Sequence, residues 1–230
     1  MTEEMPILIK EHDGIIVFRD DITRGGTKAR VIPHLFDHHK EYVYASPVQG
    51  YAQVALANAA KHHGKRAVIF CAGRRVKHPR TLEAAEAGAR IVEVSPAGYL
   101  SVVQKRARDY CNMFGARLLP FGLDTPEIRN LIASFARTLP IDPFEVWTVA
   151  GSGVLTRSLQ LAWPKAKFNA VQIGAEPNIG TAKLYKAGES FEDNAKYPPP
   201  FPSCSNYDAK AWQFIRKHAS PGALFWNVAK

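Results

Sequence analysis

Apolar and polar positions alternate along this chain in short blocks that predict strands followed by helices. Apolar runs typical of buried strands occupy residues 42–45, 67–71, 91–94, 117–121, 145–149 and 170–173. The longer period of an amphipathic helix occupies residues 49–63, 81–87, 100–114, 125–139 and 154–162. Alternation of this kind predicts an α/β fold in which mainly parallel sheets are flanked by helices.

Turn and cap signals refine this pattern. Asp13-Gly14, in the middle of the apolar run 7–18, predicts a β-hairpin. Thr81 and Thr125 have the residue type and position of helix caps, so each is expected to begin a helix. The proline-rich stretch 197–203 is the internal segment expected to lack ordered structure.

Size and composition place the chain among globular proteins. It has 230 residues, 46% of them hydrophobic, which is enough for one substantial core or two modest lobes. No apolar run approaches the roughly 20 residues that span a bilayer, and residues 1–4 lack the basic-then-apolar pattern of a secretion signal. Three well-separated cysteines, Cys71, Cys111 and Cys204, are expected to be reduced thiols, so we expect a cytoplasmic protein.

The charge of the chain favours a polyanionic partner. The formal net charge is +9, and a field of that sign attracts nucleic acid. The predicted nucleic-acid contacts lie in one basic cluster, Arg74, Arg75, Lys77 and Arg80. A solvated basic surface without a partner remains the alternative. The adjacent pairs His38-His39 and His62-His63 suit a metal poorly, because neighbouring side chains diverge, so no metal site is predicted.

Lys28 is the first candidate for chemistry. It follows Gly25 and Gly26, which let the backbone adopt positive φ and approach a ligand closely, and it begins a predicted helix. A lysine held there and partly desolvated can act as a nucleophile at neutral pH. The alternative is an ordinary solvated lysine after a Gly-Gly turn.

A glycine-rich turn between a strand and a helix is the second candidate. Gly151, Ser152 and Gly153 follow the strand 145–149, and Thr156 adds a hydroxyl in the first helical turn. Unpaired N–H groups and the positive end of the helix form a phosphate cradle there. A lysine behind glycines together with such a cradle indicates an aldehyde cofactor that carries a phosphate, namely pyridoxal 5′-phosphate.

These motifs resemble those of fold type II pyridoxal-phosphate enzymes, the tryptophan synthase β-like superfamily, and among them 1-aminocyclopropane-1-carboxylate deaminase and D-cysteine desulfhydrase. Their acidic pair and Gly-Gly-Asn-Lys-x-Arg motif is matched by residues 20–21 and 25–30, and their phosphate loop by residues 151–153. Residues 207–211 resemble their Tyr-x-Gly-Lys-Ala segment, and residues 223–225 their last core strand. The resemblance implies that Lys28 is the Schiff-base lysine and a proton shuttle.

The same resemblance implies two lobes, with residues 1–40 and 120–230 in a larger cofactor-binding lobe and residues 41–119 in a smaller one. Three departures bear on activity. Gly50-Tyr51 stands where the family has Ser-Asn, so the Tyr51 hydroxyl is a candidate catalytic group. The final strand lacks Thr-Gly-Gly, and the chain is shorter than the family by about a hundred residues, which suggests a more open site.

Tyr207 and Asp208 complete the predicted site. Asp208 stands where the deaminase has a glutamate facing the pyridine nitrogen, and a carboxylate there keeps that nitrogen protonated. The alternative for Asp208 is a surface aspartate that caps the following helix. Tyr207 is a candidate second catalytic hydroxyl or a core side chain.

Three functions remain open. The first is a pyridoxal-phosphate lyase that decarboxylates an amino acid attached to a thymine base in DNA, because compactness and charge resemble the setting of bacteriophage DNA hypermodification. The second is a deaminase or β-eliminating lyase of a small free amino acid. The third is a non-catalytic relative that binds the cofactor or nucleic acid. The expected partners are an amino-acid-bearing substrate and DNA, without a membrane, and a homodimer is one option for assembly.

Overall fold

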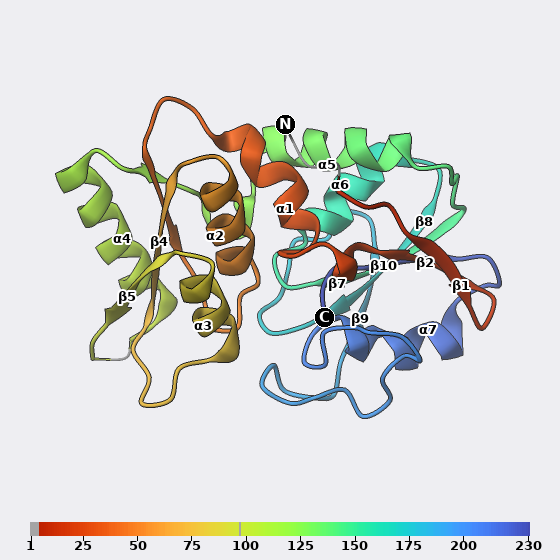
Figure 1. Cartoon of the computed structure of the whole chain (residues 1–230). Helices are drawn as coiled ribbons and strands as arrows, with labels where there is room; N and C mark the ends of the chain where they lie inside the picture. The colour runs from red at the N-terminus through yellow and green to blue at the C-terminus, as the bar shows by residue number, and fades with distance from the viewer. Residues whose placement is uncertain (1–4, 97) are drawn as a thin grey trace. The chain divides into compact units, whose positions relative to one another are not determined.

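The computed structural model describes residues 5–96 and 98–230, which form two compact units (Figure 1). The larger unit contains the chain up to Thr23 and from Asp124 to Lys230, and the smaller unit contains Arg24–Leu123. The sequence predicted lobe boundaries at residues 40 and 120, and these stay a prediction of how the lobes function. The compact units of the structure divide instead after Thr23 and after Leu123, so the segment 24–40 is part of the smaller unit.

The larger unit is built on a six-stranded sheet in the order β1-β2-β10-β7-β8-β9. Its strands are β1 (Ile9–His12), β2 (Ile15–Arg19), β7 (Glu145–Ala150), β8 (Lys167–Gln172), β9 (Lys183–Lys186) and β10 (Leu224–Asn227). β1 and β2 form the predicted antiparallel hairpin, and every other neighbouring pair is parallel. The last strand of the chain therefore lies between strands from its beginning and its middle.

Helices cover both faces of this sheet. They are α5 (Pro126–Thr138), α6 (Val154–Ala162) and α7 (Trp212–His218), with 3-10 turns η1 (Asp20–Ile22) and η4 (Asp208–Ala211). α5 and α6 lie on one side and α7 on the other (Figure 1). Successive residues of a strand point to opposite faces of the sheet. In β10, Phe225 therefore packs with Trp212 of α7, whereas its neighbour Trp226 packs with Phe135 of α5.

The smaller unit has a four-stranded parallel sheet in the order β5-β4-β3-β6. The strands are β3 (Glu41–Ala45), β4 (Arg66–Ala72), β5 (Arg90–Val94) and β6 (Arg117–Leu118). The helices are α1 (Thr27–Val31), α2 (Ala52–His62), α3 (Pro79–Glu86) and α4 (Leu100–Phe114), with η2 (Ile32–Leu35) and η3 (Phe121–Leu123). Figure 1 shows α4 on one side of the sheet and α2 with α3 on the other. The prediction of an α/β fold with mainly parallel sheets is confirmed.

Three element boundaries differ from the prediction for local reasons. α3 begins at Pro79 with His78 as its cap, so Thr81 lies inside the helix instead of starting it; proline is favoured at the first helical position. The predicted strand 117–121 ends at Leu118, and residues 121–123 form a 3-10 turn. The helix expected from residue 49 begins at Ala52, because the Gly50 N–H closes a turn onto the Pro47 carbonyl at 2.8 Å.

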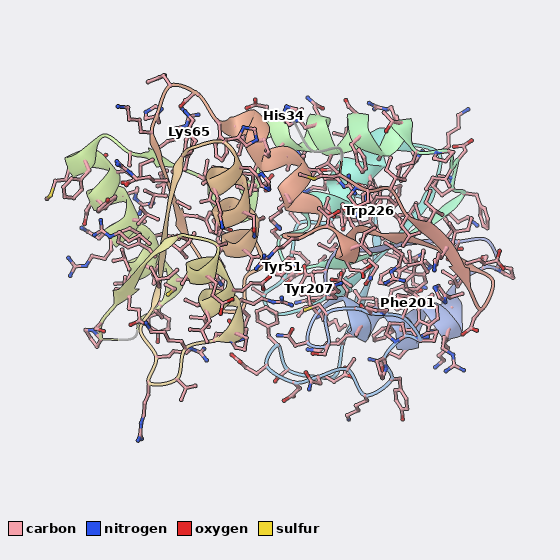
Figure 2. All side chains as sticks on the ribbon, in the orientation of Figure 1. His34, Tyr51, Lys65, Phe201, Tyr207 and Trp226 are labelled. Carbon is pink, nitrogen blue, oxygen red and sulfur yellow. The ribbon has the colours of Figure 1, made fainter. Side chains whose placement is uncertain are left out.

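Two further differences involve the larger unit. The edge strand β9 was not predicted, since its four residues carry no long apolar run. The stretch 197–203 has no regular secondary structure but is anchored: Phe201 is buried and its ring lies 5.2 Å from that of Trp212 in α7 (Figure 2). The expectation that this stretch lacks order was therefore wrong.

Cys71, Cys111 and Cys204 are buried thiols that form no disulfide with one another. None of the helices in the described part of the chain combines the length and the apolar character that a bilayer crossing requires. Residues 1–4, which entered the expectation of a cytoplasmic protein, lie outside the described residues.

A buried network of one ion pair and several hydrogen bonds connects β2 with β10 at the carboxyl edge of the larger sheet. The Arg19 guanidinium donates to both carboxylate oxygens of Asp21, at 2.6 and 2.9 Å. Asn227, at the end of β10, donates its side-chain N–H to the same carboxylate at 2.7 Å. Ser203 donates to the Asn227 side chain at 2.7 Å, which attaches the proline-rich segment to this network. Charges removed from water are stable only with such pairing.

We expect Asp21→Ala to lower the free energy of unfolding by about 3–5 kcal/mol, because it leaves the Arg19 charge buried without its carboxylate. The double variant Arg19→Met/Asp21→Ala should lose less than this single variant, since the uncompensated charge is removed as well. Urea unfolding measures both. A double variant that loses the sum of the two single losses would contradict the expected coupling.

Candidate functional site

Gly25 and Gly26 determine how Lys28 is held in the smaller unit. Gly26, at the start of α1, has φ 64° and ψ −157°, a region open essentially to glycine alone. Gly25 has φ +99°, and a Cβ added there would lie 2.6 Å from the Cα of Ala55 in α2. The glycines therefore allow α1 to pack directly on α2. Lys28, the second residue of α1, is half-buried, and its role as the lysine that attaches a cofactor stays a prediction.

Tyr51 lies immediately before α2 in the same unit (Figure 2). Its ring is half-buried and is stacked by the Arg80 guanidinium, whose central carbon is 4.3 Å from the ring centroid. Arg80 also forms an ion pair with Glu83 at 3.1 Å. The structure thus brings together two residues that were predicted for different tasks, Tyr51 for catalysis and Arg80 for nucleic acid.

The other predicted nucleic-acid contacts follow the carboxyl end of β4. Arg74, Arg75 and Lys77 are all exposed. The Lys77 ammonium lies 3.9 Å from the Glu93 carboxylate, a separation at which an exposed pair contributes little to stability. Contact between these residues and nucleic acid stays a prediction.

The glycine turn of the larger unit has the geometry of a phosphate cradle. Gly153 precedes α6 in the left-handed region at φ 77°, and a Cβ there would lie 1.8 Å from the Asn178 carbonyl oxygen. The first helical hydrogen bond runs from the Arg157 N–H to the Gly153 carbonyl at 3.1 Å. The N–H groups of residues 154–156 precede that bond and point out of the helix end, where the helix dipole attracts an anion. No sequence signal identified Asn178 as the neighbour of this turn.

Tyr207 binds the cradle directly. The Gly151 N–H donates to the Tyr207 hydroxyl oxygen at 2.8 Å, across 56 residues of sequence. Burial, and secondarily the charge of Asp208, raises the pKa of Tyr207 well above its ordinary value of 10. The hydroxyl therefore stays protonated at neutral pH, and while its oxygen accepts from Gly151 its proton can be donated to a further acceptor.

Asp208 is completely buried, so the interpretation as a surface aspartate is wrong. Its carboxylate accepts a hydrogen bond from the Ala229 N–H at 3.1 Å. Tyr207, rather than Asp208, occupies the cap position of η4. The structure therefore holds a buried carboxylate next in sequence to the tyrosine that contacts the cradle.

The two hydroxyl residues of the turn differ in their surroundings. Ser152 is half-buried at the turn itself. Thr156 is completely buried, and its hydroxyl lies 2.8 Å from that of Thr148 in β7. The Thr156 side chain therefore joins the helix to the strand, and its contact with a cofactor stays a prediction.

No protein-family profile matches the sequence, and no curated protein is significantly similar to it. Solved structures are similar in fold. A 1-aminocyclopropane-1-carboxylate (ACC) deaminase homologue has a TM-score of 0.81 at 15% identity, covering 99% of this chain and 89% of that one. A threonine deaminase (from T.th.) has a TM-score of 0.71 at 13% identity, covering 98% of this chain and 92% of that one.

Diaminopropionate ammonia lyase from Escherichia coli has a TM-score of 0.66 at 13% identity, covering 98% of this chain and 82% of that one. Such identities establish a shared fold. The fold is that of fold type II pyridoxal-phosphate enzymes, in a chain shorter than is typical of them.

We expect Gly153→Ala to lower the free energy of unfolding by about 3 kcal/mol or more. An alanine in the left-handed backbone conformation of Gly153 costs about 1–2 kcal/mol. Its Cβ would in addition overlap with the Asn178 carbonyl oxygen. Gly174→Ala is the matched control, since Gly174 has φ +81° and no atom within 4 Å of an added Cβ, so it should lose only the conformational part. Equal losses in chemical denaturation would contradict the close approach.

Tyr207→Phe removes the acceptor of the Gly151 N–H. We expect it to lower the free energy of unfolding by about 1–3 kcal/mol, the cost of leaving a partly buried donor unsatisfied, and to speed amide exchange at Gly151. Hydrogen exchange followed by mass spectrometry measures the second effect. Tyr197→Phe is the control because Tyr197 is largely exposed, and unchanged exchange at Gly151 in Tyr207→Phe would contradict the contact.

Proposed function

We propose that this protein is a pyridoxal-phosphate-dependent lyase that releases ammonia from a small free amino acid. The observation that supports this is that one fold type II chain carries both Lys28, behind two glycines at the start of α1, and a glycine cradle at the start of α6. Two of the structures similar in fold are named as deaminases or their homologues and a third as an ammonia lyase.

The residues of the cradle fit the cofactor's phosphate. The N–H groups at the start of α6 would hold its negative charge. The positive φ at Gly153 favours glycine, which has no side chain to cover that end of the helix. Gly151 contributes its lack of a side chain, since a Cβ there would lie 3.1 Å from the Tyr207 hydroxyl. Bound pyridoxal phosphate would supply an electron sink for the α-carbon of the amino acid.

Lys28 would attach the cofactor through Nζ and afterwards move the proton at the α-carbon. A lysine that attaches an aldehyde must react as the free amine, and Lys28 is half-buried behind the two glycines. Asp208 would hold a proton on the pyridine nitrogen with its buried carboxylate, which the Ala229 N–H keeps in place. The Tyr207 hydroxyl, protonated at neutral pH, would donate to the bound ligand.

A second candidate is decarboxylation of an amino acid carried on a DNA base. It is supported by the complete burial of Asp208, because a permanently protonated ring nitrogen is most useful when no β-leaving group assists the reaction. The exposed cations Arg74, Arg75 and Lys77 would contact the phosphates. This candidate predicts carbon dioxide release from modified DNA that falls steeply with added salt, whereas ammonia release from free amino acids should be little affected by DNA.

A non-catalytic relative is the third candidate. It would bind the cofactor or nucleic acid without turnover, and Lys28→Ala would then have the same nucleic-acid affinity as the parent protein. The departures at Gly50-Tyr51 and in the final strand motivate it.

The visible absorption spectrum tests the proposal. Purified protein with added pyridoxal phosphate should gain a visible absorption band. Reduction with borohydride should then attach the cofactor permanently to the peptide that contains Lys28. Lys28→Ala should lose the band and at least about 100-fold of the ammonia release, because the attaching group is removed. Lys61→Ala, an exposed lysine of α2, should leave both unchanged. Absence of a band in the parent protein, or its retention in Lys28→Ala, would overturn the proposal.

A further inference from the structure

A cavity of about 810 Å³ opens at the amino edge of the smaller sheet. Lys40 precedes β3, and Arg66 and Arg90 are the first residues of β4 and β5; all three line the cavity. The strands are parallel, so their first residues come together at one edge. Lys28, Tyr51 and the basic cluster of Arg74, Arg75, Lys77 and Arg80 are not among the residues that line it.

The charge of the cavity wall is positive. Lys40, Arg66 and Arg90 contribute three cations and Glu41 one carboxylate, and His38 and His39 add two imidazoles. Glu41 is already engaged, because it accepts from the Arg66 guanidinium at 3.1 Å and from the Tyr110 hydroxyl at 2.7 Å. Lys40 and Arg90 therefore supply an excess of positive charge, which favours an anionic ligand.

Aromatic rings form the other part of the wall. Tyr110 and Phe114 lie one turn apart on α4 with their ring centroids 4.6 Å apart, and both line the cavity. Phe114 is 62% exposed, so its ring is accessible to a ligand. The ring centroids of Phe70 and Tyr110 lie 5.4 Å apart, and the Arg90 guanidinium donates to the Tyr110 hydroxyl at 3.2 Å. These two contacts hold the Tyr110 ring in position. A held ring beside an exposed one is a platform for a planar group.

A metal ion suits the neighbouring loop less well. The side-chain ligand atoms of Asp37, His38 and His39 lie within 4.8 Å of one another. However, the Asp37 carboxylate already accepts from the Tyr42 hydroxyl at 2.8 Å and lies 3.2 Å from the Arg117 guanidinium. The charge of this carboxylate is therefore already compensated by a neighbouring cation, which opposes a further one.

We propose that this cavity binds a phosphorylated nucleoside, either as a free nucleotide or as a residue of single-stranded nucleic acid. The base stacks on Phe114 and Tyr110, and the phosphate pairs with Arg90 and Lys40. A volume of about 810 Å³ lies in the range of small-ligand sites. A planar ring joined to an anion matches both parts of the wall, whereas inorganic phosphate matches only the cations.

Titration calorimetry and fluorescence anisotropy at two salt concentrations test this with three probes: thymidine monophosphate, a labelled hexathymidylate and inorganic phosphate. Phe114→Ala should weaken binding of the nucleotide or the oligonucleotide roughly 10-fold, the loss of one stacking partner. The control is Met113→Ala, the exposed neighbour on the same helix that does not line the cavity, which should bind as the parent does.

Arg90→Gln should weaken binding and lower the slope of log affinity against log salt by about one, as for the loss of one phosphate contact. Arg108→Gln, an exposed arginine of α4 outside the cavity wall, is the matched control. Binding of the monophosphate would identify a free-nucleotide site, and binding of the hexathymidylate alone a nucleic-acid site. Equal affinity for inorganic phosphate, equal losses in the control variants, or no binding of any probe would overturn the proposal.

Discussion

The ion pair between Arg19 and Asp21, with Asn227 bound to the same carboxylate, is the interaction on which the larger unit depends. It joins side chains 206 positions apart in the sequence and sets the end of β10 beside the end of β2, where Asn227 pairs in register with Arg19. Because β10 also pairs with β7, this register carries through to the strand that leads into the glycine cradle. A buried charge pair tolerates little displacement, so it is well suited to hold that register.

Close backbone approach at a single glycine occurs in each unit, beside Lys28 in the smaller unit and in the turn before α6 in the larger unit. Gly25 allows α1 to contact Ala55 of α2, and Gly153 allows the turn before α6 to contact the Asn178 carbonyl. In each case a side chain would separate the two segments and move the residues that carry the chemistry. The glycines therefore act twice, first by permitting an unusual φ and then by permitting contact.

The smaller unit carries positive charge at both edges of its sheet, and the surroundings of the charges differ between the two edges. At the carboxyl edge, the exposed cations at 74–77 belong to the loop after β4. At the amino edge, the cations precede or begin strands, and they share a cavity with two aromatic rings. Charge alone attracts any polyanion, whereas charge beside a stacking surface selects a ring-bearing one. The net charge of +9 could not by itself distinguish these two surfaces.

The sequence by itself determined most of the order of strands and helices, without the edge strand β9, and also the hairpin at Asp13-Gly14, the cap at Thr125 and the fold class. These features depend on periodicity and on residues a few positions apart, which the linear chain displays directly. It also marked Lys28 and the turn 151–153 as candidates, because each follows a local glycine motif. Only the tertiary structure decided that Tyr207 binds Gly151, that Arg80 covers Tyr51, that Asp208 is buried and that Asn178 contacts Gly153. The cavity beside Phe114 was likewise decided there, because contacts between distant residues depend on how whole elements pack, and no local pattern records that packing.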